Sequence, residues 1–309
     1  MALLPNEHER NIAFSASIQM ALQQDDTRLW QFSATHEGED TTDGSAFDEM
    51  AAFGRPAVVT NPHAYNPIVI SELQFTRRWL RARMWKDHKH WPSVTDTVNL
   101  SDPTNPVIQY FRASFNTEKD RYWIEQYFGP TQRGMLAPAG DTDITWPAAQ
   151  TIAVDVLGPG VTPAATGMNR WKINEAFALF LRNEATKYNT GSPQIHIAVS
   201  SKQFLNLLND DTLNDRMSIL GQFTAQGWIN YIGIMFHHSE NLPVTVSGSH
   251  RRCPVWMAEG IKIKTAKEPS PRLTQLDGIE LHPWQATVNM KIAAARANEK
   301  LCAEILCDE

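Results

Sequence analysis

The longest helical pattern in the chain lies between Asn105 and Gly129. Asn105 and Pro106 form a favoured pairing of N-cap and first helical residue, and Gly129 followed by Pro130 predicts a left-handed stop before a residue that cannot continue a helix. Apolar residues recur at helical spacing near both ends, whereas residues 116–121 are polar on every side. The pattern predicts one helix of about 23 residues, about 35 Å long. A helix with this pattern connects two regions instead of filling one core.

Two more helices are predicted in the C-terminal half, on either side of a short strand. Asn169 is expected to cap a helix whose apolar residues recur as far as Tyr188. Residues 195–199 are typical of a buried strand, and Ser200 or Ser201 then begins the third helix.

The remaining apolar patterns predict strands. Residues 151–157, 228–236 and 255–265 are strand-like, and residues 284–294 alternate between apolar and polar side chains with a period of two. A second, shorter alternation follows at residues 301–305. Helices and strands in this order predict an α/β or α+β core, of which α+β is the expected fold class. The last strands return late in the chain, so we expect them to pair close to the long helix.

Residues 35–100 show few helical patterns and carry two opposed blocks of charge. Residues 37–49 contain six acidic residues and no Lys or Arg, and residues 77–89 contain six basic residues and a single acid, Asp87. This pattern predicts a long β-hairpin with an acidic limb and a basic limb, stabilised by lying on another surface. The alternative is that the two blocks are solvated faces of an ordinary surface.

The composition excludes several classes of protein. The chain has 309 residues and a formal net charge of -6, which argues against a surface that coats nucleic acid. Its three cysteines show no CxxC spacing and are interpreted as reduced thiols. No signal peptide is visible at the N-terminus, and no apolar run approaches the roughly 18 residues needed to span a bilayer.

The search for catalytic motifs assigns no catalytic, cofactor-binding or metal-binding residue. The sequence contains no GxSxG, Walker-type, GxGxxG or HExxH motif. His88 and His90 would face the same side of a strand and are the best metal candidates. Zinc requires about three or four ligands, and no third one is obvious nearby. Polar side chains on a basic hairpin limb are the favoured explanation of the pair, because the surrounding cations disfavour a metal ion.

Aromatic residues are interleaved with the arginines of the basic block. Trp79, Trp85 and Trp91 could stack nucleic-acid bases. Aromatic and Arg anchors at a protein–protein interface explain the same composition and are favoured here, because the chain as a whole is acidic.

The order of these parts resembles the major capsid proteins of tailed bacteriophages, which have the Hong-Kong-ninety-seven-type fold. The segments that carry the resemblance are residues 174–210, 227–243, 254–263 and 282–307. The resemblance implies an N-terminal arm at residues 1–34, an extended loop at 35–95, a peripheral domain at 96–167 and 282–309 with its spine helix at 105–128, and an axial domain at 168–281.

The resemblance also implies a function. The chain is expected to assemble with copies of itself, as hexamers and pentamers, into the icosahedral head shell that encloses double-stranded DNA. A separate scaffolding protein, a portal and weak, non-specific contact with the packaged DNA are expected partners, and no membrane is. Assembly is expected in the host cytoplasm and the product is the virion. The expected subunit-interface residues are Glu37, Glu39, Asp40, Asp43, Arg77, Arg78, Trp79, Arg81, Arg83 and Trp85. The alternatives are an encapsulin-like compartment and a metal-dependent enzyme using His88 and His90.

Overall fold

The computed structural model describes ten stretches of the chain: residues 27–37, 45–50, 75–91, 106–133, 143–185, 195–209, 228–231, 234–246, 248–275 and 284–309. Outside them lie most of the predicted N-terminal arm, the acidic residues Glu39, Asp40 and Asp43, the tip of the predicted hairpin and the predicted N-cap Asn105.

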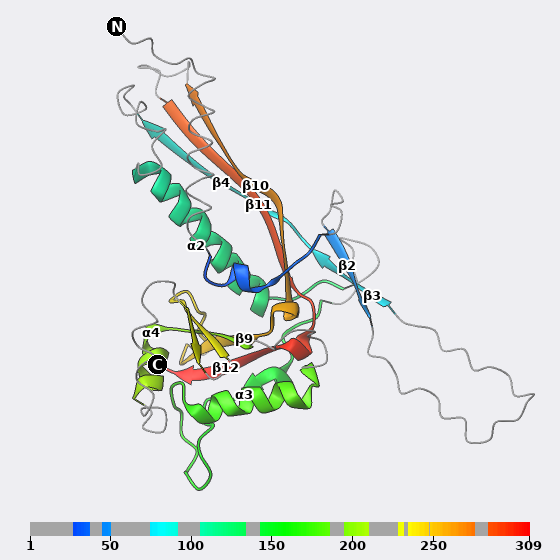
Figure 1. The fold of residues 1–309 in the computed structure, drawn as a ribbon, viewed down its shortest axis with the longest axis vertical. Helices are drawn as coiled ribbons and strands as arrows, with labels where there is room; N and C mark the ends of the chain where they lie inside the picture. Colours follow the sequence, from blue (N-terminus) through cyan, green and yellow to red (C-terminus); the bar gives the residue numbers. More distant parts are fainter. Residues whose placement is uncertain are drawn as a thin grey trace, which may run out of the picture.

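The described residues form an elongated molecule with two main sheets (Figure 1). The four-stranded sheet contains, in spatial order, β1 (Ala34–Thr35), β10 (Ile261–Gln275), β11 (Trp284–Arg296) and β4 (Arg83–Trp91). The six-stranded sheet contains β5 (Thr151–Ile152), β12 (Cys302–Asp308), β9 (His250–Trp256), β6 (Ile195–Val199), β8 (Ile234–His238) and β7 (Trp228–Tyr231). A separate antiparallel pair, β2 (Ser45–Met50) and β3 (Phe75–Leu80), projects to one side.

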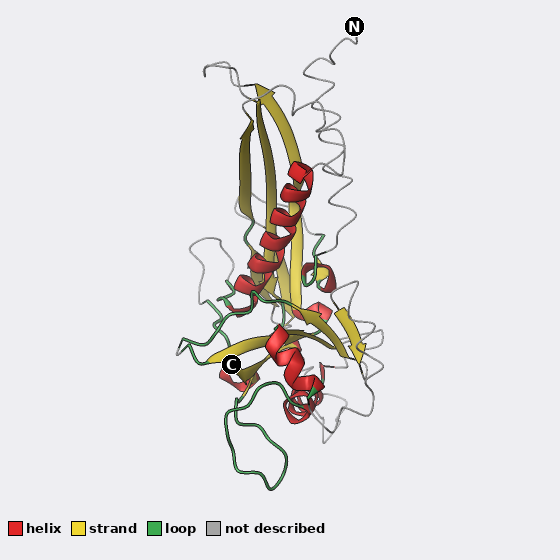
Figure 2. Ribbon diagram, turned by 90° about the vertical axis from the view of Figure 1, so that its left-hand side faces the viewer, coloured by secondary structure: helices red, strands yellow, loops and turns green. Residues whose placement is uncertain are grey.

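The long helix is α2 (Pro106–Phe128), as the sequence predicts. It lies along one face of the four-stranded sheet (Figure 2). The prediction of a left-handed stop at Gly129 is wrong, because the described glycines with positive φ are Gly160 and Gly248. Glycine is needed at this position for space: a Cβ on Gly129 would lie 2.7 Å from the carbonyl oxygen of Glu125, the oxygen to which the Gly129 N–H donates.

The C-terminal turns of α2 join the two sheets. The Tyr127 hydroxyl is fully buried and lies 2.7 Å from the carbonyl oxygen of Val255 and 2.8 Å from that of Ala303. Trp123, one turn earlier, packs against Trp256 of β9 with ring centroids 4.7 Å apart. The prediction that this helix connects two regions is confirmed.

The polar middle of α2 also has a structural partner. The Asp120 carboxylate accepts hydrogen bonds from the backbone N–H groups of Arg28, Leu29 and Trp30 at 2.9–3.2 Å. Burial raises the pKa of Asp120, and the three N–H donors oppose that rise. Asp120 therefore anchors the short 3-10 helix η1 (Trp30–Phe32) to the centre of α2.

Two strands switch sheets at one crossing point. β9 continues through η6 (Ala258–Gly260) into β10, and β11 continues through η7 (Glu299–Leu301) into β12. The crossing turns are hydrogen-bonded, with Met257 N–H donating to Leu301 O at 3.1 Å and Ala297 N–H donating to Gly260 O at 2.8 Å. A Cβ on Gly260 would lie 2.8 Å from both Cys302 Sγ and Leu301 O, so the two chains approach more closely than a side chain would permit.

This crossing pairs strands that fall in different predicted domains. β10 lies within the predicted axial range 168–281 but pairs with β11, and β12 lies within the predicted peripheral range but pairs with β9. Similarly, β4 falls in the predicted extended loop 35–95 but pairs with β11 from Trp284↔Trp91 to Ile292↔Arg83. A local pattern identifies a strand, whereas its sheet depends on contacts that are distant in sequence.

The smaller elements follow their local signals at their starts. α3 (Arg170–Arg182) is capped by Asn169 and α4 (Ser201–Leu208) by Ser200, as predicted. α3 ends earlier than the predicted Tyr188, because Asn183 closes it and Glu184 has a φ of 54°.

The predicted strands are confirmed with changed bounds. The segment 228–236 splits into β7 and β8, and only Thr151–Ile152 of the segment 151–157 is a strand. Burial alternates along β11 as far as Ile292 and then covers both faces, because Leu80 packs with Ala293 and Ala295. In the part of the chain that the structure describes, no helix has the length and apolar character needed to cross a bilayer.

Candidate subunit interface

The predicted hairpin is present, and its two charged limbs pair with each other. β2 and β3 are antiparallel, with Asp48 opposite Arg77 and Ser45 opposite Leu80. The basic block, however, continues past the hairpin into β4 of the four-stranded sheet. The hairpin thus leaves the body of the molecule at residues 80–83.

Arg78 does not fit the predicted role in contact between subunits. Its guanidinium is buried and donates two hydrogen bonds to the Glu299 carboxylate at 2.6 and 2.7 Å and one to the Arg296 carbonyl at 3.1 Å. Burial alone would raise the pKa of Glu299, but the hydrogen bonds and charge of Arg78, with the charge of Arg296, hold that pKa below its ordinary value. Arg78 is therefore removed from the interface set, because its donors are engaged within its own chain.

Arg296 completes this buried charge cluster. Its guanidinium donates to the carbonyl oxygens of Tyr127, Gly129 and Ile144. Together Arg78, Glu299 and Arg296 attach the root of the hairpin to the C-terminal end of α2.

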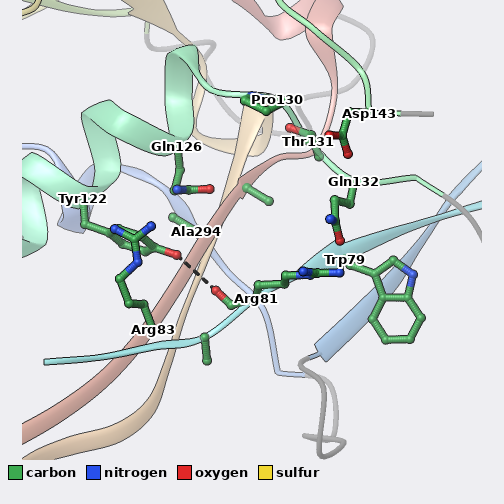
Figure 3. Close-up of a pocket in the computed structure, with 12 residues that line it drawn as sticks. Trp79, Arg81, Arg83, Tyr122, Gln126, Pro130, Thr131, Gln132, Asp143 and Ala294 are labelled. Atoms are coloured by element: carbon green, nitrogen blue, oxygen red, sulfur yellow. Dashed lines mark hydrogen bonds between the residues drawn. The ribbon is translucent and has the colours of Figure 1, made fainter. Parts of the chain in front are cut away.

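A pocket of about 340 Å³ lies beside this root (Figure 3). Its walls come from the end of β3, the connection from β3 to the start of β4, the last turns of α2, the segment after α2 and the end of β11. The lining residues are Trp79, Arg81, Ala82, Arg83, Tyr122, Gln126, Pro130, Thr131, Gln132, Asp143, Ala294 and Ala295. Three of the predicted interface residues, Trp79, Arg81 and Arg83, are therefore brought together around one pocket.

Arg83 forms one side of the pocket and is paired within the chain. Its two terminal nitrogens lie 3.1 Å from the two oxygens of Glu125, and its guanidinium lies 5.2 Å from the centre of the Tyr122 ring. Both side chains of the ion pair are about half exposed, so the pair contributes at most about 1 kcal/mol to stability. Burial raises the pKa of Tyr122 to about 12, so the phenol stays protonated and donates to the Arg81 carbonyl at 3.0 Å.

Arg81 is different from its neighbours. Its side chain is exposed and extends toward Trp79 and Gln132, away from Tyr122 (Figure 3). Within the described ranges, no hydrogen bond or ion pair engages its guanidinium. Among the described residues, Arg81 is thus the pocket arginine whose donors are not engaged.

The other predicted interface residues are less informative. Trp85 is half-buried and packs edge-on against Tyr122, with ring centroids 6.2 Å apart. Glu37 is exposed just after β1. The side chains of Glu39, Asp40, Asp43 and Arg77 lie outside the part of the chain that the structure describes. Sequence reasoning missed Tyr122, Gln126, Gln132 and Asp143 as pocket residues. No local signal indicates them, because each comes from a segment distant from the basic block.

The two histidines considered as metal ligands lie on β4, at the edge of the four-stranded sheet. His88 Nδ1 lies 3.0 Å from Thr287 Oγ1 and 3.2 Å from Gln285 Nε2 of the adjacent strand. Among the residues that the structure describes, no three His, Cys, Asp or Glu side chains group as a metal site would require.

One cluster resembles a hydrolytic triad in composition but not in geometry. Ser201 Oγ and a Glu240 carboxylate oxygen both contact His238 Nε2, at 2.9 and 2.8 Å, whereas His238 Nδ1 lies 3.1 Å from Arg28 Nη1. A triad needs its carboxylate on the ring nitrogen opposite the nucleophile. Glu240 instead accepts from the Ser201 N–H and hydroxyl, which lower its pKa to about 2, and so fastens the first turn of α4.

A second exposed surface lies on α3. One face of this helix is buried through Ala176, Leu179 and Phe180, and on its outer face Trp171, Phe177 and Leu181 are 41%, 48% and 50% exposed. Large apolar side chains grouped on one surface are typical of contact with another protein.

Structural comparison defines the class of fold. A capsid of Helicobacter pylori bacteriophage KHP30 superposes with a TM-score of 0.59 at 9% sequence identity, covering 92% of each chain. Mycobacterium phage Adephagia gives a TM-score of 0.58 at 14% identity over 93% of this chain and 91% of that one. The fold is that of tailed-phage capsid proteins, as predicted.

The sequence comparison gives the family. The chain matches the phage capsid protein family over residues 9–309, and it belongs to that family. It is thus a capsid subunit, and a comparison with curated proteins gives no match. A virus-like particle from Pyrococcus furiosus is also similar, with a TM-score of 0.51 at 8% identity over 97% of this chain and 100% of that one.

Proposed function

We propose that this protein is the major subunit of an icosahedral phage head and that it closes its shell through hexamers and pentamers. Membership of the capsid family is the observation that supports this most directly. The chain also has a projecting hairpin and an exposed apolar helix face, two surfaces that a single subunit leaves uncovered. Different surfaces that meet head to tail generate rings when the rotation between subunits closes, and a closed ring is the geometry that a capsomer requires.

The hairpin is proposed to lie on a neighbouring subunit. β2 and β3 form a two-stranded pair separate from both main sheets, and an isolated two-stranded hairpin is marginally stable in water. Each exposed charge pair in such a contact contributes up to about 1 kcal/mol. Repeated over many subunits, these contributions add up and fix the alignment of neighbouring subunits.

The acidic subunit suits a container for DNA. With a net charge of -6, the shell would attract packaged DNA weakly and without sequence preference. A separate scaffolding protein and a portal complete the proposed assembly, which takes place in the host cytoplasm. We also propose that the protein has a structural role and catalyses no reaction.

Electron microscopy and light scattering of purified protein test this proposal, with and without the phage's scaffolding protein. Closed particles of uniform size are expected. Monomers under every condition, at concentrations up to the solubility limit, would contradict it.

A protein compartment is the second candidate, favoured by the similarity to the Pyrococcus furiosus virus-like particle. Particles isolated from infected cells and treated with nuclease distinguish the two. Protected double-stranded DNA of constant length supports the phage head, whereas particles that enclose a cargo protein and no nucleic acid support the compartment.

A further inference from the structure

The arginines at the root of the hairpin differ in whether residues of their own chain accept hydrogen bonds from their guanidinium groups. Arg78 donates to Glu299, Arg296 donates to three carbonyl groups, and Arg83 is paired with Glu125. Arg81 lies beside these arginines, and none of the described residues pairs with its guanidinium. It is also the one that extends along the pocket toward Trp79.

The pocket combines apolar walls with polar groups that can donate hydrogen bonds. Ala82, Ala294 and Ala295, together with the rings of Trp79 and Tyr122, can enclose the methylene groups of a side chain. The amides of Gln126 and Gln132 and the guanidinium of Arg81 supply donors, and Asp143 is the one carboxylate in the lining. A volume of about 340 Å³ is enough for a side chain and part of its backbone. These features match an Asp or Glu side chain carried by a peptide.

The same chain contains a segment of the complementary charge. Residues 37–49 hold six acidic residues and no Lys or Arg. None of the described acidic residues pairs with Arg81, and the acidic segment runs into β2 of the hairpin in the same chain. A second copy of the chain brings a second acidic segment, and shell assembly brings the copies into contact.

We propose, on the basis of the proposed shell function, that this pocket binds an acidic side chain from residues 37–43 of a neighbouring copy, with Arg81 as its ion-pair partner. An Arg–carboxylate pair that is partly desolvated by aromatic and apolar walls is directional as well as attractive. The pocket then sets the register between adjacent subunits at the root of the hairpin.

Charge reversal at Arg81 is the first test, made under the conditions in which the wild-type chain forms particles. R81E is expected to raise the protein concentration needed for assembly at least about tenfold, because it places a carboxylate opposite the acidic side chain of the neighbouring copy. The monomer should retain its fold, as judged by circular dichroism. K202E, which makes the same change of charge on an exposed residue of α4, should assemble as the wild type does.

Mixing of variants identifies the partner and shows whether it belongs to a second copy. E37R, E39R, D40R and D43R are made one at a time, and each is mixed in equal amounts with R81E. Each is also combined with R81E in one chain as a double variant. If the pair forms between copies, one acidic-segment variant should assemble poorly alone and should form hexamers with R81E, because six subunits can alternate and so restore every pair.

Three outcomes overturn the inference. Normal assembly of R81E would show that the pocket is not used. Failure of every mixture and of every double variant would show that Arg81 does not pair with this segment. Rescue in a double variant but in no mixture would assign the pair to a single chain. None of these outcomes changes whether the wild-type chain forms particles, so the proposed function is tested separately.

Discussion

Replacing Glu299 by Gln tests the buried charge cluster that holds the hairpin root. Glu299 accepts two hydrogen bonds from Arg78, whose side chain is 2% exposed, and lies 3.8 Å from the Nε of the buried Arg296. E299Q preserves the shape and one acceptor oxygen but leaves two buried guanidinium groups without a negative charge.

The expected loss is about 2–3 kcal/mol of unfolding free energy. Removing one partner of a fully buried pair costs about 3–5 kcal/mol. The Glu299 side chain is 19% exposed, so water screens part of the effect and reduces the expected loss to about 2–3 kcal/mol. The pair Arg182–Glu175 provides a matched control: its side chains are 64% and 45% exposed, so E175Q should cost less than about 0.5 kcal/mol.

Urea unfolding of the unassembled chain, followed by tryptophan fluorescence, measures both variants. The double variant R78M/E299M should recover part of the loss, because it removes one of the two buried guanidinium groups that E299Q leaves without a negative charge, whereas Arg296 remains. Limited proteolysis should show faster cleavage in the hairpin of E299Q. Equal stability of E299Q and E175Q would refute the assignment of this pair as the anchor of the hairpin.

Three further predictions follow. Burial lowers the pKa of His196 to about 4, so this residue binds more protons in the unfolded chain, and its contribution to stability should fall by about 2 kcal/mol from pH 7 to pH 5. Urea midpoints should therefore fall less with pH in H196F than in the wild type, and an unchanged slope in H196F would contradict this. G260A should lose at least about 1 kcal/mol in the same assay, since its Cβ would meet the second crossing chain at 2.8 Å; wild-type stability would refute this. F177D and L181D should leave the monomer folded and reduce particle yield in sedimentation, because those side chains are half exposed; normal yield would remove α3 from the interface.

Local patterns determined the existence and often the starts of the elements. Asn169 and Ser200 cap helices because their side chains can accept backbone N–H groups wherever the helix packs. The alternation before Ile292 produces a strand because one face of a sheet is buried. The order of these parts was enough for the resemblance to capsid proteins.

The tertiary structure decided which sheet each strand joins and which charges are free. The chain passes from one sheet to the other between β9 and β10 and again between β11 and β12. The two connections cross at Gly260, where their close approach leaves no space for a side chain. Arg78 and Arg81 belong to the same basic run, yet one is buried against Glu299 and the other is exposed beside the pocket. Their difference depends on residues more than 200 positions away, and so a local pattern contains no information about it.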